Sequence, residues 1–577
     1  MPGYLWDGPL ERDGAERPAP GPGPTIYYAP GVNELATGPF EITFLPHGRS
    51  ARVSAGATLM DAAILCGVWV DAPCGGEGRC GKCLVRADGE LAPPSPAEIE
   101  HVSPARLSEG WRLACQACIT GPCTVDTGPV PSWAAAKSGF SRRGPLGVDL
   151  PSLPTDVKEP AGAAVDVGTT TLCVSLVDLR SGVRMGISSA ENPQTRFGAD
   201  VMTRIERCRN DGAASSEMHR EVTESTNLLL REVTTAAGVE ASRVVRVVMV
   251  GNTTMLHLAL GEDPSPLGSY PFEPAVRGPV RTHASTVGLE ALPSAELLVP
   301  AVLSGFLGAD IVAVILSSGA AESDAVTLMV DLGTNGEIAL ASRRRIAACS
   351  TAAGPAFEGA QISSGMRAIP GAIESMSRDG LFVPGVLGGG APLGICGSGL
   401  LDAVAALLEQ RIIAPSGRLI EPAAAEAVAP GRVRQTGSMR EFVLAPGTDI
   451  TLTQEDIRQL QLAKGAIGAG VDVLCSRLGV TGDLVENVYL AGVFGSFLKP
   501  AAAVAAGLFP AQMKDRIEFA GNAALDGAEL MLASDGSWKE ALRLAGSVEV
   551  VELSGDPEFE KAFIDRLSFP GEAPRRC

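Results

Sequence analysis

Hydrophobic and polar positions near the N-terminus alternate with the period of short β-strands and then change to the period of an amphipathic helix. Pro46-His47-Gly48 supplies a turn between the first two strand-like stretches. Thr58 is placed to cap a helix that has Leu59, Ala62 and Ala63 on one face. The pattern therefore predicts a small domain of mixed strands and helices. Its expected elements are strands at 40–45, 49–53 and 119–125 and helices at 58–66 and 95–107.

A different pattern begins near Ala163 and continues to about Leu567. Short stretches rich in Val, Ile and Ala alternate with helical stretches and glycine-rich turns, which is typical of an α/β domain. A strand followed by a glycine turn at 164–170 recurs at 328–334, and this recurrence suggests two related halves. The clearest strands are expected at 164–167, 172–177, 244–250, 327–331, 338–341 and 487–490.

Segments rich in proline and glycine divide the chain. The first has the composition of a disordered tail, and the second lies between the two folded patterns and is expected to be a linker. The sequence thus predicts an α/β multidomain protein with a β-grasp-like N-terminal domain. The expected segments are a tail at 1–38, the β-grasp-like domain at 39–128, the linker at 129–160 and the larger domain at 161–577.

Charge and composition argue against some classes of function. The formal net charge is −19 and the longest basic cluster is Arg343–Arg345, so a nucleic acid, which needs a basic face, is not expected as a partner. No apolar run reaches the roughly 18 residues of a membrane helix, and the first 25 residues lack the apolar core of a secretory signal. We therefore expect a cytoplasmic protein with no membrane partner, whose 13 cysteines are thiols, ligands or nucleophiles.

Three cysteines, Cys74, Cys80 and Cys83, form the pattern C-x5-C-x2-C, and Cys115 follows after 31 residues in the context Arg-Leu-Ala-Cys. Four glycines lie between the first three cysteines, and a loop that wraps a metal cluster needs such sharp turns. Four thiolates can hold a [2Fe–2S] cluster. The alternative is a zinc site of Cys80, Cys83, Cys115 and Cys118, which would leave Cys74 and its glycines without a role.

The cysteine spacing resembles that of the [2Fe–2S] ferredoxins and is closer to the vertebrate type than to the plant type. The resemblance implies a bound [2Fe–2S] cluster, with Cys118 and Cys123 as ordinary thiols near it. The four ligands would be Cys74, Cys80, Cys83 and Cys115.

Two copies of a strand followed by a glycine turn carry the candidate nucleotide chemistry. In each copy an aspartate near the end of an apolar strand, Asp166 or Asp331, precedes a glycine turn with hydroxyl or amide side chains. Backbone N–H groups and hydroxyls of such loops can donate to phosphate oxygens, and the aspartates can hold Mg²⁺ through its waters or orient the attacking water. One copy could be a tight hairpin, but two copies 165 residues apart favour a clamp on ATP. The expected nucleotide contacts are Gly168, Thr169 and Thr170 in the first copy and Gly333, Thr334, Asn335 and Gly336 in the second.

A third segment, Val488–Ser496, is a strand that runs into Gly492 and Gly495, whose bare backbone could hold the adenosine. The three-part layout resembles the superfamily of acetate and sugar kinases, heat-shock chaperones and actin. This resemblance implies a two-lobed actin-like ATPase domain that binds ATP and Mg²⁺. Val493 replaces the second glycine of the pair that this superfamily often has near the adenosine.

Several further segments occur in the order found in the reductive activators of corrinoid proteins, and the chain from about Phe40 to Leu567 resembles this family. Residues 129–160 stand where some members carry an extra small domain. The matching segments are Asn192-Pro193-Gln194, Phe197–Val201, Val250–Met255 with His257, Ser350–Ile362, Gly394–Gly399, Asp456–Ile467 and Gly521–Leu525.

The resemblance implies ATP-dependent one-electron reduction of the inactive Co(II) corrinoid protein of a methyltransferase system to Co(I), with Asp166 and Asp331 as catalytic residues of the ATPase. A ferredoxin-type cluster at roughly −400 mV would pass its electron uphill to such a cobalt, so ATP would drive the change. An upstream reductase, ferredoxin or flavodoxin would supply the electron, and a homodimer is compatible with the sequence. The alternatives are an ATP-driven electron donor to another low-potential enzyme and a small-molecule kinase with a fused ferredoxin domain.

Overall fold

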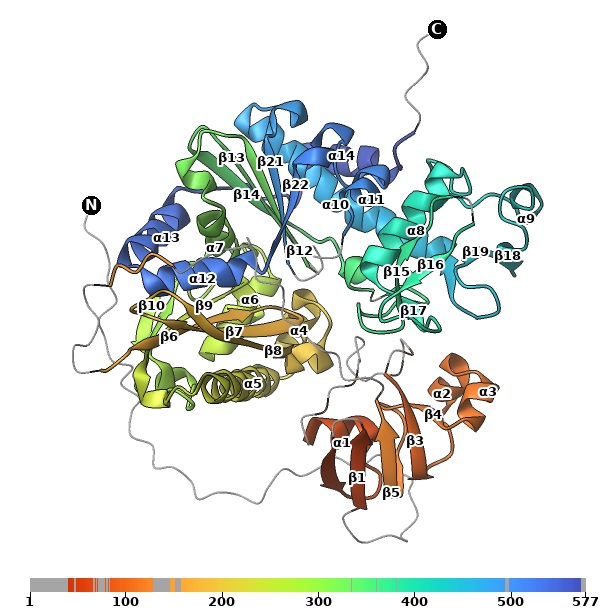
Figure 1. Cartoon of the computed structure of the whole chain (residues 1–577), viewed down its shortest axis with the longest axis horizontal. Helices are drawn as coiled ribbons and strands as arrows, with labels where there is room; N and C mark the ends of the chain where they lie inside the picture. Colours follow the sequence, from red (N-terminus) through yellow and green to blue (C-terminus); the bar gives the residue numbers. More distant parts are fainter. Residues whose placement is uncertain are drawn as a thin grey trace.

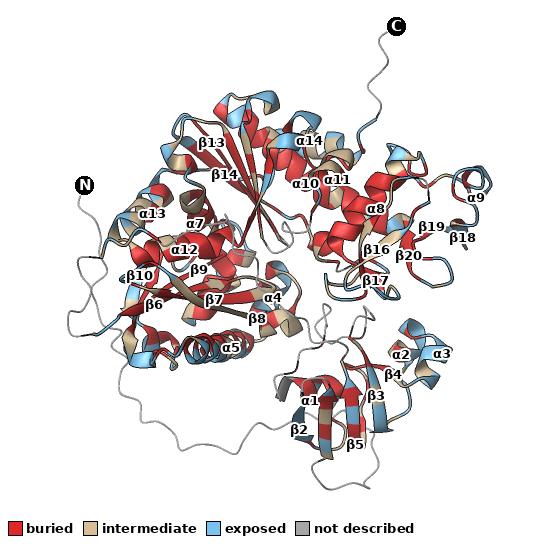
Figure 2. Cartoon of the chain, in the orientation of Figure 1, coloured by how far each residue is buried: buried red, intermediate tan, exposed pale blue. Residues whose placement is uncertain are grey.

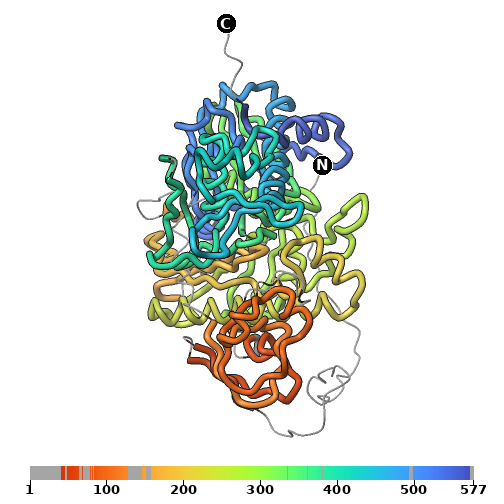
Figure 3. The backbone as a smooth tube through the Cα atoms, turned by 90° about the vertical axis from the view of Figure 1, so that its right-hand side faces the viewer, coloured from red at the N-terminus to blue at the C-terminus, as the bar shows by residue number. Residues whose placement is uncertain are grey.

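The computed structural model of the chain consists of a small N-terminal domain and a larger α/β domain (Figure 1). Figure 1 and the turned view in Figure 3 both show the small domain as a separate body at one end of the molecule. The tail expected at 1–38 lies outside the described residues. The structure describes residues 40–45, 48–65, 68, 70, 78, 81, 83–127, 146–150, 157–333, 335–359, 361–379, 381–492 and 498–571.

The N-terminal domain is built on a five-stranded sheet with the order β2-β1-β5-β3-β4. β1 is antiparallel to β2 and parallel to β5, and the predicted strands at 40–45, 49–53 and 119–125 are confirmed. The N–H of Asp61 donates to Thr58 Oγ1 over 3.1 Å, so Thr58 caps α1 as predicted. The bounds are β1 Phe40–Leu45, β2 Arg49–Val53, α1 Leu59–Leu65, β3 Leu84–Leu91, β4 Trp111–Leu113 and β5 Ile119–Asp126.

The single helix expected at 95–107 is wrong, because the chain forms two short helices there, α2 (Pro96–His101) and α3 (Pro104–Ser108). The break lies at Val102 and Ser103, whose backbones are extended. A residue before proline is disfavoured in the helical region, and Ser103 precedes Pro104 and caps the new helix instead. The Ser-Pro pair was therefore a boundary signal within an otherwise helical pattern.

The larger domain contains two six-stranded sheets built on one plan. Their orders are β10-β11-β9-β6-β7-β8 and β22-β21-β12-β13-β14-β23. In each sheet three antiparallel strands are followed by a strand that pairs in parallel with the first of them, which is β9 with β6 and β21 with β12. This shared topology confirms the two related halves, and the six predicted strands of this domain are confirmed.

The first sheet contains β6 Ala161–Val167, β7 Thr171–Asp178, β8 Arg184–Glu191, β9 Val244–Gly251, β10 Val280–His283 and β11 Glu296–Val299. The second sheet contains β12 Thr327–Leu332, β13 Gly336–Ser342, β14 Arg345–Thr351, β21 Asn487–Ala491, β22 Ile517–Gly521 and β23 Glu549–Val550.

Helix α12 links the two halves. It follows β22 of the second sheet, yet it packs against α7 and against β6 and β9 of the first sheet. The chain therefore crosses back to the first half between β22 and α12. A second core lies between the other sheet and helices α8 and α10, and Figure 2 shows these helices as largely buried. The helices of this domain are α4 Val201–Asn210, α5 Ala214–Ala237, α6 Thr253–Leu260, α7 Ala309–Ser318, α8 Gly397–Glu409, α9 Pro422–Ala425, α10 Gln454–Leu478, α11 Pro500–Ala505, α12 Ala523–Ala533, α13 Asp535–Ser547 and α14 Pro557–Leu567.

Two small three-stranded sheets, β16-β15-β17 and β18-β19-β20, are inserted between β14 and α10. Their strands have between 2 and 5 residues, too few to show a period of two, and the sequence did not predict them. The bounds are β15 Ala372–Met376, β16 Pro384–Val386, β17 Gly394–Ile395, β18 Val433–Thr436, β19 Met439–Val443 and β20 Thr451–Thr453.

Part of the segment expected to be a linker, 129–160, packs on the larger domain. The N–H of Leu146 donates to the Gly182 carbonyl at 2.9 Å, and Asp149 forms backbone bonds of 3.0 Å to Ala533 and 2.9 Å from Asp535. Residues 146–150 thus pack on the larger domain, and the rest of the predicted linker up to residue 156 lies outside the described residues. No helix in the described part of the chain is long and apolar enough to cross a membrane.

Candidate functional site

Two of the four predicted cluster ligands lie together at the end of the β3–β4 pair. Cys83 immediately precedes β3 and Cys115 follows β4, and the pairing of Leu84 with Leu113 sets their register. The N–H of Ala114 donates to the Cys83 carbonyl at 2.8 Å. The two thiols are buried with their Sγ atoms 3.1 Å apart, close enough for both to reach one cluster. The other two predicted ligands, Cys74 and Cys80, lie outside the described residues.

The glycines beside these cysteines occupy positions that exclude a side chain. Gly78 has φ +76°, and a Cβ there would lie 2.9 Å from the side chain of Gln116. Gly81 has φ +65°, and a Cβ there would lie 3.0 Å from His101 Cβ. Both are in the left-handed region that favours glycine. Two positions near the predicted ligands thus favour glycine, as expected for a chain that wraps a [2Fe–2S] cluster.

A buried ion pair holds the strand that leads to Cys115. Arg112 donates to Glu98 from Nε at 2.8 Å and from Nη2 at 3.1 Å, and the Glu98 side chain is 0% exposed. Glu98 Oε1 also accepts the N–H of Leu113 at 3.2 Å. Burial acts to raise the pKa of Glu98, but the bonds from Arg112 and from backbone N–H groups lower it below its ordinary value. The carboxylate thus stays charged and ties α2 to β4.

The environments of Cys118 and Cys123 fit ordinary thiols. Burial, with the nearby Glu98 and Asp61 carboxylates, raises the pKa of Cys118, and its thiol donates to the Gln116 carbonyl over 3.8 Å. Burial raises the pKa of Cys123 to about 11. Both thiols therefore stay protonated in the metal-free protein.

The first predicted nucleotide loop is the hairpin between β6 and β7. The N–H of Gly168 donates to the Thr171 carbonyl at 3.0 Å, and a Cβ at Gly168 would lie 2.6 Å from that oxygen. A side chain is therefore excluded at this turn. Thr169 and Thr170 follow Gly168 at the tip of the hairpin and are partly exposed, so their hydroxyls can reach a ligand.

Two segments that the sequence singled out hold this loop from behind. Asn192 donates to the Gly168 carbonyl from Nδ2 and to the Thr170 carbonyl from its backbone N–H, both at 2.8 Å. Asn252, which also caps α6, donates to Thr169 Oγ1 at 2.9 Å. Because the Thr169 hydroxyl accepts this bond, its own hydrogen can be donated elsewhere, for example to a phosphate oxygen.

A fully buried arginine lies beneath the same loop. Arg204 on α4 is 0% exposed and donates to the carbonyls of Thr169 at 2.7 Å and Gly198 at 2.9 Å and to Gln194 Oε1 at 3.3 Å. Burial lowers its pKa to about 10, and the carboxylates of Asp200 and Glu358 partly oppose the shift. Within the described ranges no carboxylate forms an ion pair with Arg204, so its charge lies directly behind the loop without direct compensation.

The second predicted loop is the hairpin between β12 and β13, where the N–H of Gly333 donates to the Asn335 carbonyl at 3.1 Å. Gly336 is the first residue of β13 and is buried. Thr351 donates to its carbonyl at 3.2 Å, and a Cβ at Gly336 would lie 2.8 Å from that hydroxyl. Gly336 thus contributes to strand packing, and its contact with a nucleotide stays a prediction. Thr334 lies outside the described residues.

The two predicted aspartates lie in an acidic cluster with two further carboxylates. Asp166 and Asp331 are near the ends of β6 and β12, the equivalent strands of the two sheets. Glu337 is paired with Asp331 across the β12–β13 hairpin, and Asp310 lies in the first turn of α7. Sequence reasoning assigned no role to these two. Asp310 in particular carries no local motif, and only the packing of α7 brings it here.

Burial and mutual repulsion raise the pKa values of this cluster. Burial raises the pKa of Asp331 to about 6. Burial, together with the Asp331 carboxylate, raises the pKa of Asp166 to about 7 and that of Asp310 to about 8. The pKa of Glu337 is raised well above its ordinary value by burial and by Asp310 and Asp331.

A divalent cation would act on the charge of this acidic cluster. Carboxylates that repel one another are stabilised by a cation between them. Among the residues that the structure describes, no group of three or more His, Cys, Asp or Glu side chains could hold a metal ion. Bound Mg²⁺ therefore stays a prediction from the sequence.

Gly492 lies beside the acidic cluster. It has φ +90°, its N–H donates to the Gly521 carbonyl at 2.9 Å, and a Cβ there would lie 2.6 Å from Asp331 Oδ1. Bare backbone at this point is therefore required by the approach of the Asp331 carboxylate. Gly495, the other predicted adenosine contact, lies outside the described residues.

Three family models match consecutive parts of the chain. A 2Fe-2S iron-sulfur cluster binding domain matches residues 42–120, the RACo middle region matches 161–323, and the C-terminal domain of RACo, described as the ASKHA domain, matches 325–576. The corrinoid activation enzyme RamQ of Eubacterium limosum is 30% identical, over 90% of this chain and 97% of its own length. The chain belongs to the RACo family. These proteins are reductive activators that join an iron–sulfur domain to an ASKHA domain.

Two further relatives support this assignment. A [Co(II) methylated amine-specific corrinoid protein] reductase of Methanosarcina barkeri is 26% identical, over 71% of this chain and 77% of its own length. The solved structure of a reductive activator for corrinoid, iron-sulfur protein is 28% identical, with a TM-score of 0.64 over 92% of this chain and 99% of that one. The predicted fold class, a ferredoxin-like domain with a two-lobed actin-like domain, is confirmed.

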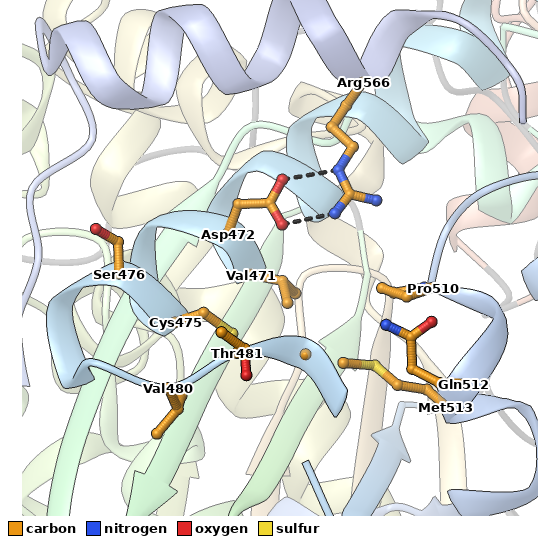
Figure 4. Close-up of a pocket in the computed structure, with 11 residues that line it drawn as sticks. Val471, Asp472, Cys475, Ser476, Val480, Thr481, Pro510, Gln512, Met513 and Arg566 are labelled. Carbon is orange, nitrogen blue, oxygen red and sulfur yellow. Dashed lines mark hydrogen bonds and ion pairs between the residues drawn. The ribbon is translucent and has the colours of Figure 1, made fainter. Parts of the chain in front are cut away.

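A cavity of about 390 Å³ opens on this RACo-family chain away from both nucleotide loops (Figure 4). Its lining comes from the end of α10, the segment that follows it, residues 510–513 and α14. Arg566 on α14 and Asp472 on α10 form a two-bond ion pair of 2.7 and 2.6 Å at one side, as Figure 4 shows. The pair fixes α14 to α10, and the cavity includes no residue of either loop.

Proposed function

We propose that this protein is an ATP-dependent reductive activator of a corrinoid protein and delivers one electron to the inactive Co(II) form, giving Co(I). One observation carries the proposal. A domain that places Cys83 and Cys115 at 3.1 Å is joined to a two-loop ASKHA domain in a chain that covers 97% of a named corrinoid activation enzyme. No feature of the described site favours the kinase alternative.

The N-terminal domain would hold the electron carrier. Cys83 and Cys115 would ligate a [2Fe–2S] cluster together with Cys74 and Cys80. When bound, the cluster supplies one-electron transfer at low potential. The protein's own contribution is rigidity, since the β3–β4 register and the Arg112–Glu98 pair fix two of the thiols before the cluster is assembled. An upstream reductase, ferredoxin or flavodoxin would reduce the cluster again after each electron transfer.

The larger domain would bind ATP between its two sheets. The hydroxyls of Thr169 and Thr170 and the charge of Arg204 would face the phosphates from the first half. Asp166 and Asp331, with Asp310 and Glu337, would face hydrated Mg²⁺. The negative phosphates would compensate the positive charge of Arg204, and the cation would compensate the negative charge of the four carboxylates.

The crossing between the halves offers a route from nucleotide to conformation. Asn522 lies at this crossing, where it accepts the N–H of Leu525 at 2.8 Å and caps α12. Its Nδ2 also donates to Asp166 Oδ2 at 2.7 Å. A change in the charge around Asp166 would therefore act directly on the segment that connects the two sheets. Closure of the halves would present the ATP-bound form to the corrinoid partner.

The test combines the purified protein with a Co(II) corrinoid protein, a chemical reductant for the cluster domain, and ATP with Mg²⁺. Growth of the Co(I) absorption band should require ATP, and ADP should not replace it. Cys83→Ser should abolish Co(I) formation while ATP hydrolysis continues, and Asp331→Asn should cut hydrolysis by orders of magnitude at unchanged iron content. Failure to form Co(I) with corrinoid proteins of several methyltransferase systems, despite ATP hydrolysis, would contradict the proposal. A homodimer remains a prediction.

A further inference from the structure

A carboxylate from the second half reaches the first nucleotide loop. Glu358 follows β14 of the second sheet, and Thr170 belongs to the hairpin of the first sheet. Thr170 Oγ1 donates to Glu358 Oε2 over 2.9 Å, although the two residues are 188 positions apart. Glu358 also lies close enough to Arg204 for its charge to oppose the lowering of the arginine's pKa. The carboxylate thus contacts the tip of the loop, at one of the two hydroxyls proposed to bind phosphate.

The chain presents Glu358 on a rigid support. It ends the short 3₁₀ turn η6 (Pro355–Glu358), whose Phe357 is 0% exposed in the second core. Gly359 follows with φ +77°, and a Cβ there would lie 2.5 Å from the Met366 carbonyl. Only glycine suits that position, so the backbone conformation after Glu358 is fixed. The carboxylate is therefore aimed at the loop by packed backbone on both sides.

The bond between Thr170 and Glu358 competes directly with ATP. A threonine hydroxyl has a single hydrogen to donate, and here it is donated to the carboxylate. A phosphate oxygen that takes this donor must displace Glu358, because two anions cannot share one hydrogen at this distance. The displaced carboxylate, held by its rigid turn, would remain next to the terminal phosphate. A carboxylate in that position can accept a hydrogen bond from a water molecule.

We propose that Glu358 is a catalytic residue of ATP hydrolysis that orients the attacking water, an inference that rests on the proposed ATPase function. With ATP bound, the terminal phosphate takes the Thr170 hydroxyl and Glu358 accepts a hydrogen bond from the water. The water oxygen forms a bond to the γ-phosphorus, and the bond to the bridging oxygen breaks with its electron pair left on ADP. The water's proton passes to Glu358 and then to the released phosphate, so that atoms and charge balance.

Glu358→Gln in the full-length protein tests the proposal, because the amide keeps the shape and can accept from Thr170 but cannot take a proton. We expect the kcat of ATP hydrolysis to fall at least about 100-fold, while the Kd of ATP stays within about threefold or tightens. Glu358→Asp, which keeps a carboxylate, should retain part of the activity. The matched control is Glu421→Gln on an exposed ion pair with Arg440, which should hydrolyse ATP at the wild-type rate.

The outcomes separate a catalytic carboxylate from a contact between the halves. Unchanged kcat with weaker ATP binding in Glu358→Gln would show a structural contact and refute the inference. Normal hydrolysis by Glu358→Gln beside an active wild type would refute the inference alone. A wild type without any ATPase activity would refute the proposed function and the inference with it. Iron content and the thermal midpoint, measured on the same samples, show whether each variant is folded.

Discussion

The buried pair of Arg112 and Glu98 allows a quantitative test of how the cluster ligands are held. Arg112→Met would leave the Glu98 carboxylate at 0% exposure with no cation beside it. Removing one partner of a buried ion pair costs about 3–5 kcal/mol. Natural domains of this size have roughly 0.05–0.15 kcal/mol of stability per residue, so the loss is a large share of the total. We expect the domain to lose its cluster at a much lower temperature.

The assay is a temperature ramp on the full-length protein that follows the visible [2Fe–2S] absorption. At roughly 4–8 °C per kcal/mol for a small domain, the midpoint of cluster loss should fall by at least about 10 °C. The matched control is Arg86→Met on β3, an exposed arginine that donates to the Glu109 carbonyl at 3.1 Å. Its midpoint should remain near that of the wild type.

The pH dependence gives a second readout with a definite sign. Without Arg112, burial should dominate and raise the pKa of Glu98 above its unfolded value of about 4.5. The folded state would then bind a proton that the unfolded state releases, and its stability would be lost as the pH rises through the raised pKa. Arg112→Met should therefore recover part of its midpoint between pH 8 and pH 5.5. A variant with the wild-type midpoint at pH 8, or with no recovery in acid, would refute the role given to the pair.

Three further predictions concern the ligands, the acidic cluster and the C-terminal helix. Cys115→Ser should abolish the [2Fe–2S] spectrum and Cys118→Ser should retain it; the reverse result would overturn the ligand assignment. Because burial raises the pKa of Asp310 from 3.8 to about 8, nucleotide-free protein should lose thermal stability as the pH rises from about 4 to about 8, and Asp310→Asn without Mg²⁺ should flatten that decline. Lys464 is 1% exposed and donates to the Arg566 and Ser568 carbonyls at the end of α14. Lys464→Met should therefore lower the free energy of unfolding by about 1–3 kcal/mol and make α14 more sensitive to proteolysis. Unchanged stability and proteolysis would refute the role given to Lys464.

The features that could be predicted from the sequence are those encoded over a few neighbouring residues. Alternation of apolar and polar residues placed β1, runs of apolar residues placed β6 and β12, and the aspartate–glycine pattern located both hairpins. The cysteine spacing also singled out Cys83 and Cys115, which the β3–β4 register brings together; their role as cluster ligands stays a prediction. Each of these signals needs only a short window of sequence.

The features that could not be predicted depend on how distant segments pack. Asp310 reaches the acidic cluster because Gly308 lies against β9, where a Cβ would be 2.2 Å from the Gly251 carbonyl. Glu358 reaches Thr170 only because the two halves face each other. Gly336 shows the opposite case, since a glycine that fits the motif by sequence also contributes to packing under Thr351. In all three cases the local pattern was compatible with more than one role, and tertiary contacts decided it.

The charges of the cleft suggest why ATP suits this protein as a source of conformational change. Arg204 lies buried behind the first loop with no ion-pair partner in the described chain, and Glu358 from the other half provides negative charge nearby. Asp166, Asp310 and Asp331 repel one another on the other side. The phosphates of ATP would compensate the positive charge of Arg204, and Mg²⁺ would reduce the repulsion among the three aspartates. Binding of ATP with Mg²⁺ would therefore stabilise both sets of charges and draw the halves together. Release of phosphate after hydrolysis would restore both imbalances and return Glu358 to Thr170. Under the proposed function, this arrangement of charges would couple the closing and reopening of the halves to the binding of ATP and the release of phosphate.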